Sequence, residues 1–406
     1  MNERLAFRIT VCFLLTFAFV HASAAQDRTI AIGDVHGSYS QLVGILQQVG
    51  LIDANRQWIG GSATLVQTGD VPDRGPRTRE CLELLMALEK EAPRENGKVI
   101  PLLGNHEVMV MLGDFRYTTR EDYATFANEG SEARREEAYR EFRTYVDASP
   151  RRRTNLGPDE AASRQKWMDE HPMGFFEFRD AFGPQGLYGR WLRTHDAVAQ
   201  VDDVIFLHGG LSPKFRFRDF REVNERVRSE IKRFDELWDL LVAKKVVWRY
   251  MTFREAAAEI HAELKARAES DREAEQAVAA REMREFLGMD EWAISSPDGP
   301  LWYRGFAEEP EGRLKPFVEK TLARFNAQHF VVGHTSLGMQ RITPRVGNRV
   351  LLIDTAMVID GRGGRTSALE IRNETFTAFY SGGEQQVIWS PGPPKAVPDV
   401  GQGRAN

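Results

Sequence analysis

Side chains of metal-binding type stand beside glycine at five separate points along the chain. In each case an apolar run ends in a Gly-Asp or Gly-Asn pair, or in a histidine next to glycine. The residues concerned are Asp34, His36, Asp70, Asn105, His208 and His334. One such pair is more often a structural turn than a site. Five in succession predict a common centre, because glycine turns the backbone sharply and leaves room for its neighbour's side chain.

The donor types suit hard or borderline divalent cations. Carboxylates, imidazoles and an amide oxygen, without a thiolate, favour Mn, Fe, Zn or Mg over softer metals. Two cations about 3.5–4 Å apart need a bridging carboxylate, and we expect Asp70 to be the bridge. The first cation is expected on Asp34, His36 and Asp70, and the second on Asp70, Asn105, His208 and His334. Mn, Fe and Zn accept the same ligands, so the sequence leaves the choice among them open.

This ligand set predicts hydrolysis of a phosphate ester. A water shared by two cations becomes a hydroxide nucleophile near neutral pH, and the cations offset charge in an in-line displacement. The leaving group needs a proton, for which His106 is the predicted acid, with Asp73 orienting its imidazole and raising its pKa. Arg74 is expected to grip phosphate oxygens, and Asn105 to contact the phosphate as well. The alternatives are a structural salt bridge for Arg74 and a buried, satisfied imidazole for His106.

The apolar runs before these polar residues predict the strands of an α/β sheet. They are rich in Val, Ile and Leu and are separated by helical stretches, as buried strands are. The runs are Thr29–Ile32, Ala63–Thr68, Lys98–Leu103, Val204–Leu207, Phe330–Val332 and Arg349–Ile353. Helical spacing is found in Ser40–Val49 and Pro76–Lys90. Ligands bind beyond the carboxyl ends of strands in open α/β sheets, which is where the polar residues fall.

The C-terminal part has strand patterns without helices between them. We expect Thr366–Ile371, Thr375–Tyr380 and Gln386–Trp389 to be antiparallel strands that form or extend a second sheet. The whole of residues 26–389 is predicted to be one domain. Residues 390–406 are rich in Pro and Gly and are predicted to be disordered.

Two long segments, around 114–195 and 214–290, interrupt the series of strands. Both are dense in Arg and Glu and largely helical in pattern. Solvated helix faces explain such charge runs, and the alternative is a cap that narrows the site around a substrate.

The N-terminus has the plan of a secretory signal peptide. Arg4 and Arg8 are followed by the uncharged run Val11–Val20 and by small residues up to Ala25. The apolar run is short for a membrane span, and an uncleaved anchor is the alternative. Residues 1–25 are therefore predicted to be removed. The mature protein is expected to be periplasmic or secreted, without stable membrane association.

Composition is that of an ordinary soluble globular protein. Of the 406 residues 42% are hydrophobic and 28% charged. A net charge of -5 gives no general attraction to nucleic acid or anionic membrane. The chain has 2 cysteines, and Cys12 lies in the predicted signal, which excludes an internal disulfide and a thiolate metal cluster in the mature protein.

The blocks around the predicted ligands resemble the phosphoprotein phosphatase family of calcineurin-like metallophosphoesterases. The blocks are Gly33–Gly37 (GDVHG), Gly69–Gly75 (GDVPDRG), Gly104–Glu107 (GNHE), His208–Pro213 (HGGLSP) and Gly333–Thr335 (GHT). They occur in the usual order over residues 33–335. The resemblance implies a four-layer αββα fold with two mixed β-sheets flanked by helices, and it implies the metal roles given above.

Two further blocks refine the resemblance. Leu301–Gly305 (LWYRG) is similar to the region where the family places a second phosphate-contacting arginine, which implies that role for Arg304. A surface arginine beside a core Trp302 is the alternative. Asp354–Met357 (DTAM) lacks the tyrosine found near the site of eukaryotic serine/threonine members. The signal, the insertions and the GNHE and WYRG blocks are more similar to the bacterial Shewanella-like phosphatase branch, which includes enzymes favouring phosphotyrosine.

Three functions are compatible with this pattern. The leading hypothesis is a metal-dependent phosphatase for phosphate monoesters, acting on phosphoprotein with phosphotyrosine preference. The second is a hydrolase of dinucleoside polyphosphates or another small phosphate ester, since the same metal pair serves it. The third is a non-catalytic metal-binding envelope module, which the loss of a ligand would favour, and the sequence has the full set. The expected partner is a phosphorylated protein or small phosphate ester and no nucleic acid.

Overall fold

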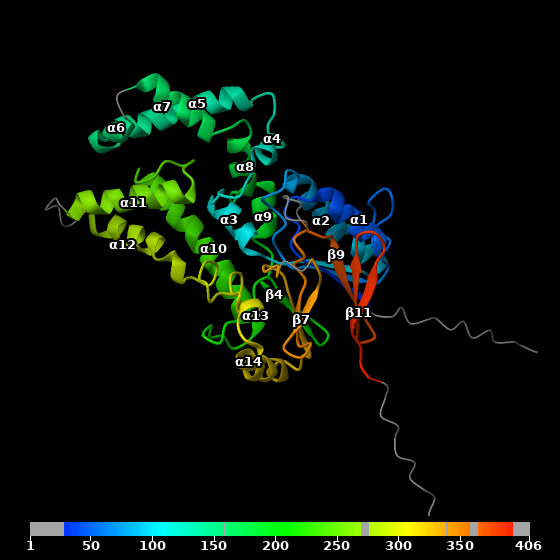
Figure 1. The fold of residues 1–406 in the computed structure, drawn as a ribbon. Coiled ribbons are helices and arrows are strands. Elements are labelled where there is room, and N and C mark those ends of the chain that lie inside the picture. The colour runs from blue at the N-terminus through cyan, green and yellow to red at the C-terminus, as the bar shows by residue number, and fades with distance from the viewer. Residues whose placement is uncertain (1–27, 157–158, 269–275, 338–339, 358–363, 393–406) are drawn as a thin grey trace, which may run out of the picture.

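The computed structural model describes residues 28–156, 159–268, 276–337, 340–357 and 364–392. The predicted signal peptide and all but the first residues of the predicted tail lie outside this part. Two β-sheets and their covering helices form the body of the molecule, and two groups of helices extend from one side of it (Figure 1). Among the described helices, none combines the length and the apolar character that a membrane crossing needs.

The first sheet contains both ends of the described chain. Its strands are β1 (Arg28–Ile32), β2 (Thr64–Gln67), β3 (Lys98–Pro101), β9 (Ser367–Arg372), β10 (Thr375–Tyr380) and β11 (Gln385–Trp389). The order is β11-β10-β9-β1-β2-β3, with β1, β2 and β3 parallel and the C-terminal strands antiparallel. The prediction of antiparallel C-terminal strands is confirmed. Their placement in a second sheet is wrong, because β9 pairs with β1 and extends the first sheet.

The second sheet is built from the middle of the chain. Its strands are β4 (Val198–Val201), β5 (Val204–Leu207), β6 (His329–Val332), β7 (Thr343–Arg345) and β8 (Val350–Leu352), in the order β4-β5-β6-β8-β7. β5, β6 and β8 are parallel, and the outer strands β4 and β7 are antiparallel. The sequence analysis missed both outer strands. β7 contains Pro344, which lacks an N–H and is tolerated at a sheet edge.

Alternation along the strands explains why two sheets pack face to face. Ala31 and Val66 of the first sheet share a buried core with Phe206, Val331 and Leu351 of the second. The strand residues on the opposite face of each sheet, such as Ile30 and Leu65, belong to a second core between the sheets and the helices that cover them. Because successive side chains in a strand point to opposite faces, each sheet buries both sides.

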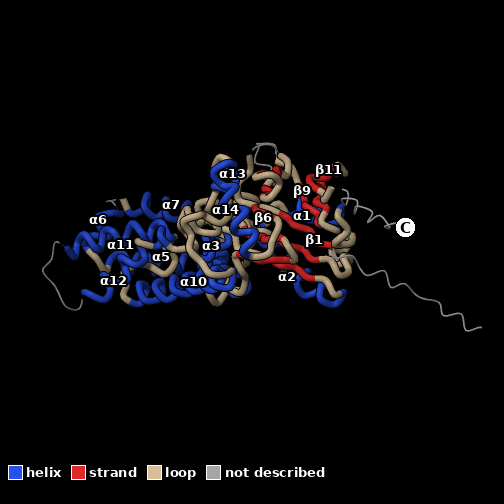
Figure 2. The backbone as a smooth tube through the Cα atoms, turned by 90° about the horizontal axis from the view of Figure 1, so that it is seen from below, coloured by secondary structure: helices blue, strands red, loops and turns tan. Residues whose placement is uncertain are grey.

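Helices cover the outer faces of the two sheets. α1 (Tyr39–Gln48), α2 (Thr78–Glu91) and the short η1 (Ala92–Glu95) lie beside the first sheet, and α13 (Gly305–Glu308) and α14 (Glu311–Arg324) beside the second (Figure 2). The predicted helices Ser40–Val49 and Pro76–Lys90 are thus confirmed within about two residues at either end. The four-layer arrangement of helix, sheet, sheet and helix is confirmed.

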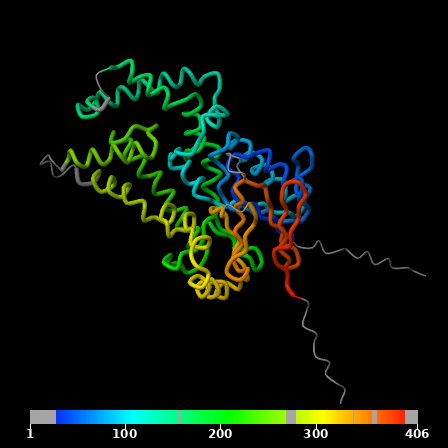
Figure 3. Tube along the Cα trace, viewed as in Figure 1, coloured from blue at the N-terminus to red at the C-terminus, as the bar shows by residue number. Residues whose placement is uncertain are grey.

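The two insertions are helical, as the sequence predicts. The first contains α4 (Arg120–Ala124), α5 (Ser131–Asp147), α6 (Pro150–Leu156), α7 (Glu160–Glu170), α8 (Phe175–Phe182) and α9 (Leu187–Leu192). The second contains α10 (Phe220–Ala243), α11 (Phe253–Ala268), α12 (Gln276–Leu287) and η2 (Met289–Glu291). The two groups lie side by side, and most of their helices extend away from the sheets (Figure 3), although α10 also contacts β4. Ion pairs join them, among them Arg151–Glu263 at 3.1 Å and Arg249–Glu141 at 2.8 Å.

Candidate active site

The first sheet contributes four of the six predicted ligands. Asp34 and His36 follow β1, Asp70 follows β2, and Asn105 opens α3 (Asn105–Leu112), the next element after β3. All four are buried. Because β1, β2 and β3 are parallel, their carboxyl ends meet at one edge of the sheet.

The second sheet contributes the other two. His208 follows β5 and His334 follows β6, and both are buried. The backbone N–H of His334 donates to Asp34 Oδ1 at 2.9 Å, so the ends of β6 and β1 are joined across the two sheets. The structure therefore brings the six predicted ligands to one place between the sheets.

The two carboxylate oxygens of Asp70 face different histidines. Its Oδ2 lies 3.7 Å from His36 Nε2, and its Oδ1 lies 3.2 Å from His208 Nε2. Asp34 Oδ2 is 3.8 Å from the same His36 nitrogen. Asp70 thus occupies the position between two sets of donors that a bridging ligand requires.

Each set contains at least three donors that one ion could contact. His36, Asp70 and His106 place ligand atoms within 4.8 Å of one another, and so do Asp70, His208 and His334. Asn105 Oδ1 lies 3.0 Å from His208 Nε2 and joins the second set. The sequence analysis assigned His106 as the acid only, whereas the structure places it close enough to the first set to be a donor as well.

The ring nitrogens are oriented by backbone carbonyls. His208 Nδ1 lies 2.9 Å from the carbonyl oxygen of Thr68, and His334 Nε2 lies 3.2 Å from that of Trp302. A carbonyl accepts a hydrogen bond from the ring nitrogen that faces it, so the opposite nitrogen of each ring faces the site. These two nitrogens, His208 Nε2 and His334 Nδ1, are 3.1 Å apart. A cation that displaces the proton of His208 could be bound by both nitrogens, so the donor set fits a metal.

The electrostatics of the two sets differ. Burial lowers the pKa of His36 to about 3 and keeps its imidazole neutral, as a metal ligand must be. Burial acts the same way on His208, but the neighbouring charge of Asp70 outweighs it and raises the pKa of His208 to about 9. The position around His208 therefore attracts positive charge.

Several site residues have a left-handed backbone. The φ angles of His36, Asp70, Asp73, Arg74 and His334 are 46°, 59°, 70°, 64° and 67°. Non-glycine residues rarely adopt this conformation, and such strain clusters at functional sites. The turns at the strand ends thus direct these side chains towards the site, and the strained backbone conformation costs free energy.

Two glycines leave no room for any other residue. A Cβ at Gly104 would lie 2.3 Å from Asp70 Oδ1, and one at Gly333 would lie 2.5 Å from Asp34 Oδ1. Both distances are shorter than atoms tolerate. Glycine at these positions therefore allows Asp70 to pack against the backbone of Gly104 and Asp34 to pack against the backbone of Gly333.

A chain of hydrogen bonds leads to the predicted acid. His106 Nδ1 lies 2.8 Å from Asp73 Oδ2, and Thr118 Oγ1 donates to Asp73 Oδ1 at 2.6 Å. Burial opposes protonation of His106, but Asp70 and Asp73 outweigh it and raise its pKa. The imidazole of His106 therefore has a hydrogen-bond partner, which a buried, satisfied histidine without a catalytic role would also have. Its other nitrogen, Nε2, faces the site and lies 3.9 Å from Asp70 Oδ2.

The two predicted phosphate-binding arginines lie on different sides of the ligands. Arg74 Nη2 is 3.3 Å from His106 Nε2, and Arg74 forms no ion pair with a carboxylate of the described residues. The salt-bridge alternative for Arg74 is therefore not observed in the described part of the chain. Arg304 Nη1 donates to the carbonyl of His334 at 2.9 Å and to Thr335 Oγ1 at 3.0 Å.

The match to known proteins agrees with this geometry. Residues 28–335 match the family described as Calcineurin-like phosphoesterase. This chain belongs to that family. Two relatives are named Shewanella-like protein phosphatases. Shewanella-like protein phosphatase 2 of Arabidopsis thaliana is 32% identical over 51% of this chain and 52% of the relative. Shewanella-like protein phosphatase 1 of Plasmodium berghei is 25% identical over 82% of this chain and 67% of the relative. The match to the Arabidopsis relative spans about half of that protein.

A solved structure shares the fold of this phosphoesterase. A cold-active protein tyrosine phosphatase matches with a TM-score of 0.56 and 21% identity, covering 89% of this chain and 78% of that one. At this identity the likeness concerns the fold. It confirms the two mixed sheets and their helices.

Sequence reasoning gave no role to four residues of this phosphoesterase that contact the site or whose charge acts on it. They are Glu107, Tyr117, Thr118 and Asp354. Asp354 follows β8 as the ligands follow their strands, and this signal could have identified it. Tyr117 and Thr118 stand in a connecting segment without a recognisable pattern.

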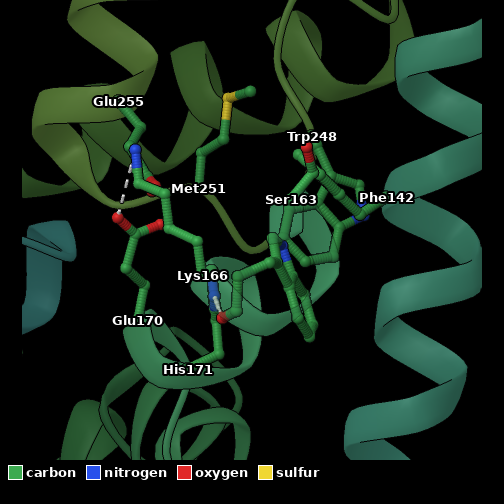
Figure 4. Close-up of a pocket in the computed structure, with 9 residues that line it drawn as sticks. Phe142, Ser163, Lys166, Glu170, His171, Trp248, Met251 and Glu255 are labelled. Carbon is green, nitrogen blue, oxygen red and sulfur yellow. Dashed lines mark hydrogen bonds and ion pairs between the residues drawn. The ribbon is translucent and has the colours of Figure 1, made fainter. Parts of the chain in front are cut away.

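A pocket between the helical insertions is separate from the ligand centre of this phosphoesterase. Figure 4 shows Phe142, Trp248 and Met251 on its wall, with Lys166 3.8 Å from Glu170 at its rim. None of the residues that line it belongs to the ligand sets.

Proposed function

We propose that this phosphoesterase is a metal-dependent phosphatase that hydrolyses phosphate monoesters, acts on phosphoproteins and prefers phosphotyrosine. The observation that carries the proposal is Asp70, whose two oxygens face His36 and His208 on opposite sides. The names of the two relatives support a protein phosphatase. The preference for phosphotyrosine rests on the resemblance to the Shewanella-like branch.

The chain's own donors would hold two divalent cations, of Mn, Fe or Zn. Asp34, His36 and Asp70 would hold the first, and Asp70, Asn105, His208 and His334 the second. When bound, such cations polarise phosphoryl oxygens and acidify water. The carbonyls of Thr68 and Trp302 keep the ring nitrogens of His208 and His334 turned towards the site.

Residues around the ligands would bind the substrate and move its proton. Arg74 and Arg304 are placed to bind phosphate oxygens, since a guanidinium grips them with paired hydrogen bonds. His106, held by Asp73 through its Nδ1, is the group that donates a proton to the leaving oxygen. The buried Asp73 keeps the imidazole oriented while the proton leaves from Nε2.

The activity is tested with an aryl phosphate and purified mature protein. With added Mn²⁺ it should release phosphate from p-nitrophenyl phosphate, and a chelator should abolish the release. Asp70→Asn should lower kcat by about a thousandfold, since it removes the shared charged ligand. Asp290→Asn, on an exposed residue, is the matched control. A fully active Asp70→Asn enzyme would contradict the mechanism.

The substrate class is tested by direct comparison. Phosphotyrosine and phosphoserine peptides of one sequence, and a dinucleoside polyphosphate, should be supplied to the same preparation. The proposal expects the phosphopeptides to be favoured. A preference for the nucleotide by orders of magnitude would support the small-ester hydrolase instead.

We also propose that the protein is exported, on the strength of the N-terminal sequence pattern. Protein recovered from an expressing bacterium should begin at Ala25 or Gln26 and leave the cell with the periplasmic fraction. Intact Met1 in membrane-bound protein would indicate the uncleaved anchor.

A further inference from the structure

Tyr117 is an exposed aromatic residue that contacts the candidate acid. Its exposed fraction is 43%, which places it among the few large apolar side chains in the described residues that face solvent. Its ring centroid lies 5.1 Å from that of His106, with the ring planes at 39°. Arg74 Cζ lies 5.3 Å from the centroid of the same ring. One side of this ring therefore contacts the catalytic groups, and the rest is open to solvent.

The backbone on both sides of Tyr117 is tied to the site. Its carbonyl accepts a hydrogen bond from the backbone N–H of Arg74 at 2.9 Å. The next residue, Thr118, donates its hydroxyl to Asp73. Phe115, two residues earlier, is buried among aromatic rings that include Phe175 and Phe178. The segment is thus anchored at three points, and the ring of Tyr117 has a fixed place beside His106.

The position of this ring relates to the leaving group. In the proposed reaction His106 gives its proton to the leaving oxygen, so the atoms bonded to that oxygen lie next to the imidazole. The ring of Tyr117 packs on His106 and is open to solvent, so it is placed to contact the atoms bonded to the leaving oxygen. An aryl group bonded to the oxygen offers a flat face or edge to the ring, whereas the single methylene of a serine ester offers little.

We propose that the ring of Tyr117 determines specificity by packing against the aryl leaving group and so favours aryl over alkyl phosphates. This inference rests on the proposed phosphatase function and adds the residue that selects the substrate class. The ring, and not the hydroxyl, is assigned the contact, because it is the ring that lies beside His106 and Arg74. Aromatic pairs of this kind contribute about a tenfold difference in transition-state binding once their burial is included.

The test compares kcat/KM for phosphotyrosine and phosphoserine peptides of one sequence, with Mn²⁺ present. Tyr117→Ala should lower the ratio of the two values about tenfold, mainly through the phosphotyrosine peptide. Tyr117→Phe keeps the ring and should keep the ratio. Leu187→Ala, which removes an exposed apolar side chain of α9, is the matched control and should also keep it.

The comparison separates a contact with substrate from mere support of His106 and Arg74. A supporting role would lower both kcat/KM values alike and leave the ratio unchanged, which overturns the proposal. A Tyr117→Phe enzyme that loses the ratio as far as Tyr117→Ala overturns it too. Should Tyr117→Ala fail to fold, as judged by circular dichroism, Tyr117→Leu removes the ring while keeping an apolar side chain. Absence of any turnover in the wild-type enzyme would overturn the phosphatase function together with this inference.

Discussion

Glu107 holds the backbone of Asp70. One of its carboxylate oxygens accepts the N–H of Asp70 at 2.8 Å, and the other accepts that of Val71 at 2.7 Å. The N–H of Gly104 adds a third bond at 2.7 Å. Glu107 is buried, so these bonds are shielded from water. The left-handed turn at the shared candidate ligand thus depends on a residue from the first turn of α3.

Replacing Glu107 by glutamine should therefore destabilise the protein and weaken the site. An amide offers one acceptor where the carboxylate has two and turns N–H groups towards buried donors. The expected loss is about 2–3 kcal/mol of unfolding free energy. Activity should fall about tenfold or more, as when groups that support metal ligands are changed. Urea denaturation gives the first quantity and p-nitrophenyl phosphate hydrolysis the second.

Glu95→Gln, on an exposed residue, is the matched control for this prediction and should leave both quantities unchanged. If Glu107→Gln were as stable and as active as the wild type, the three hydrogen bonds would not be what fixes Asp70.

Thr118→Val should slow the step in which the leaving group departs. The change removes the hydroxyl that holds Asp73, so His106 is less well oriented as an acid. We expect kcat for phenyl phosphate, a poor leaving group, to fall about tenfold, and that for p-nitrophenyl phosphate to fall about twofold, because the latter needs little protonation. Steady-state measurement of kcat for the variant and the wild type on both substrates tests this prediction.

An equal loss on both substrates would assign Thr118 a structural role only. Thr144→Val, on the exposed surface of α5, is the control and should change neither rate.

Metal should stabilise the folded protein through the same donors. A ligand that binds only the folded state adds about 2.7 kcal/mol at one hundred times its Kd, so Mn²⁺ should raise Tm by several degrees in chelator-treated protein. Asp70→Asn removes the charge of the shared ligand and should lose most of this rise. Thermal denaturation across a Mn²⁺ titration measures both, independently of activity. An equal rise in the Asp70→Asn variant would place the metal elsewhere.

His195 should make stability depend on pH. It is buried against Trp191, neither ring nitrogen has a partner in the described residues, and burial lowers its pKa to about 4. In the unfolded chain His195 has its ordinary pKa of about 6.5 and binds a proton more readily than in the folded state. The free energy of unfolding therefore decreases as the pH falls from about 6.5 towards about 4. Between pH 7 and pH 5 this contributes a loss of about 2 kcal/mol.

His195→Phe should remove that part of the pH dependence. Urea denaturation at pH 5 and pH 7, with chelator present, measures it as the difference between variant and wild type. His261→Phe changes an exposed histidine and should follow the wild type. An identical pH dependence in His195→Phe would mean that the buried ring does not titrate as inferred.

The strand ends and their ligands could be predicted because each is a local feature of the sequence. An apolar run stopped by glycine and followed by Asp, Asn or His specifies both the strand and the donor at its end. Val204–Leu207, which is followed by His208 and Gly209, was predicted to the residue for this reason. Thr375–Tyr380 was predicted to the residue from its strand pattern alone. The outer strands β4 and β7 were not, because β4 does not end in glycine and β7 is only three residues long and contains Pro344.

The sequence by itself determined six of the candidate donors, all of the described strands except β4 and β7, and the helical character of both insertions. The tertiary structure decided that β9 joins β1, that Asp70 faces two histidines, and that Tyr117, Thr118 and Glu107 reach the site. The physical reason is that donor type and strand propensity belong to single residues and short runs. Pairing between strands, and contacts across loops, depend on which surfaces are buried together when the whole chain folds.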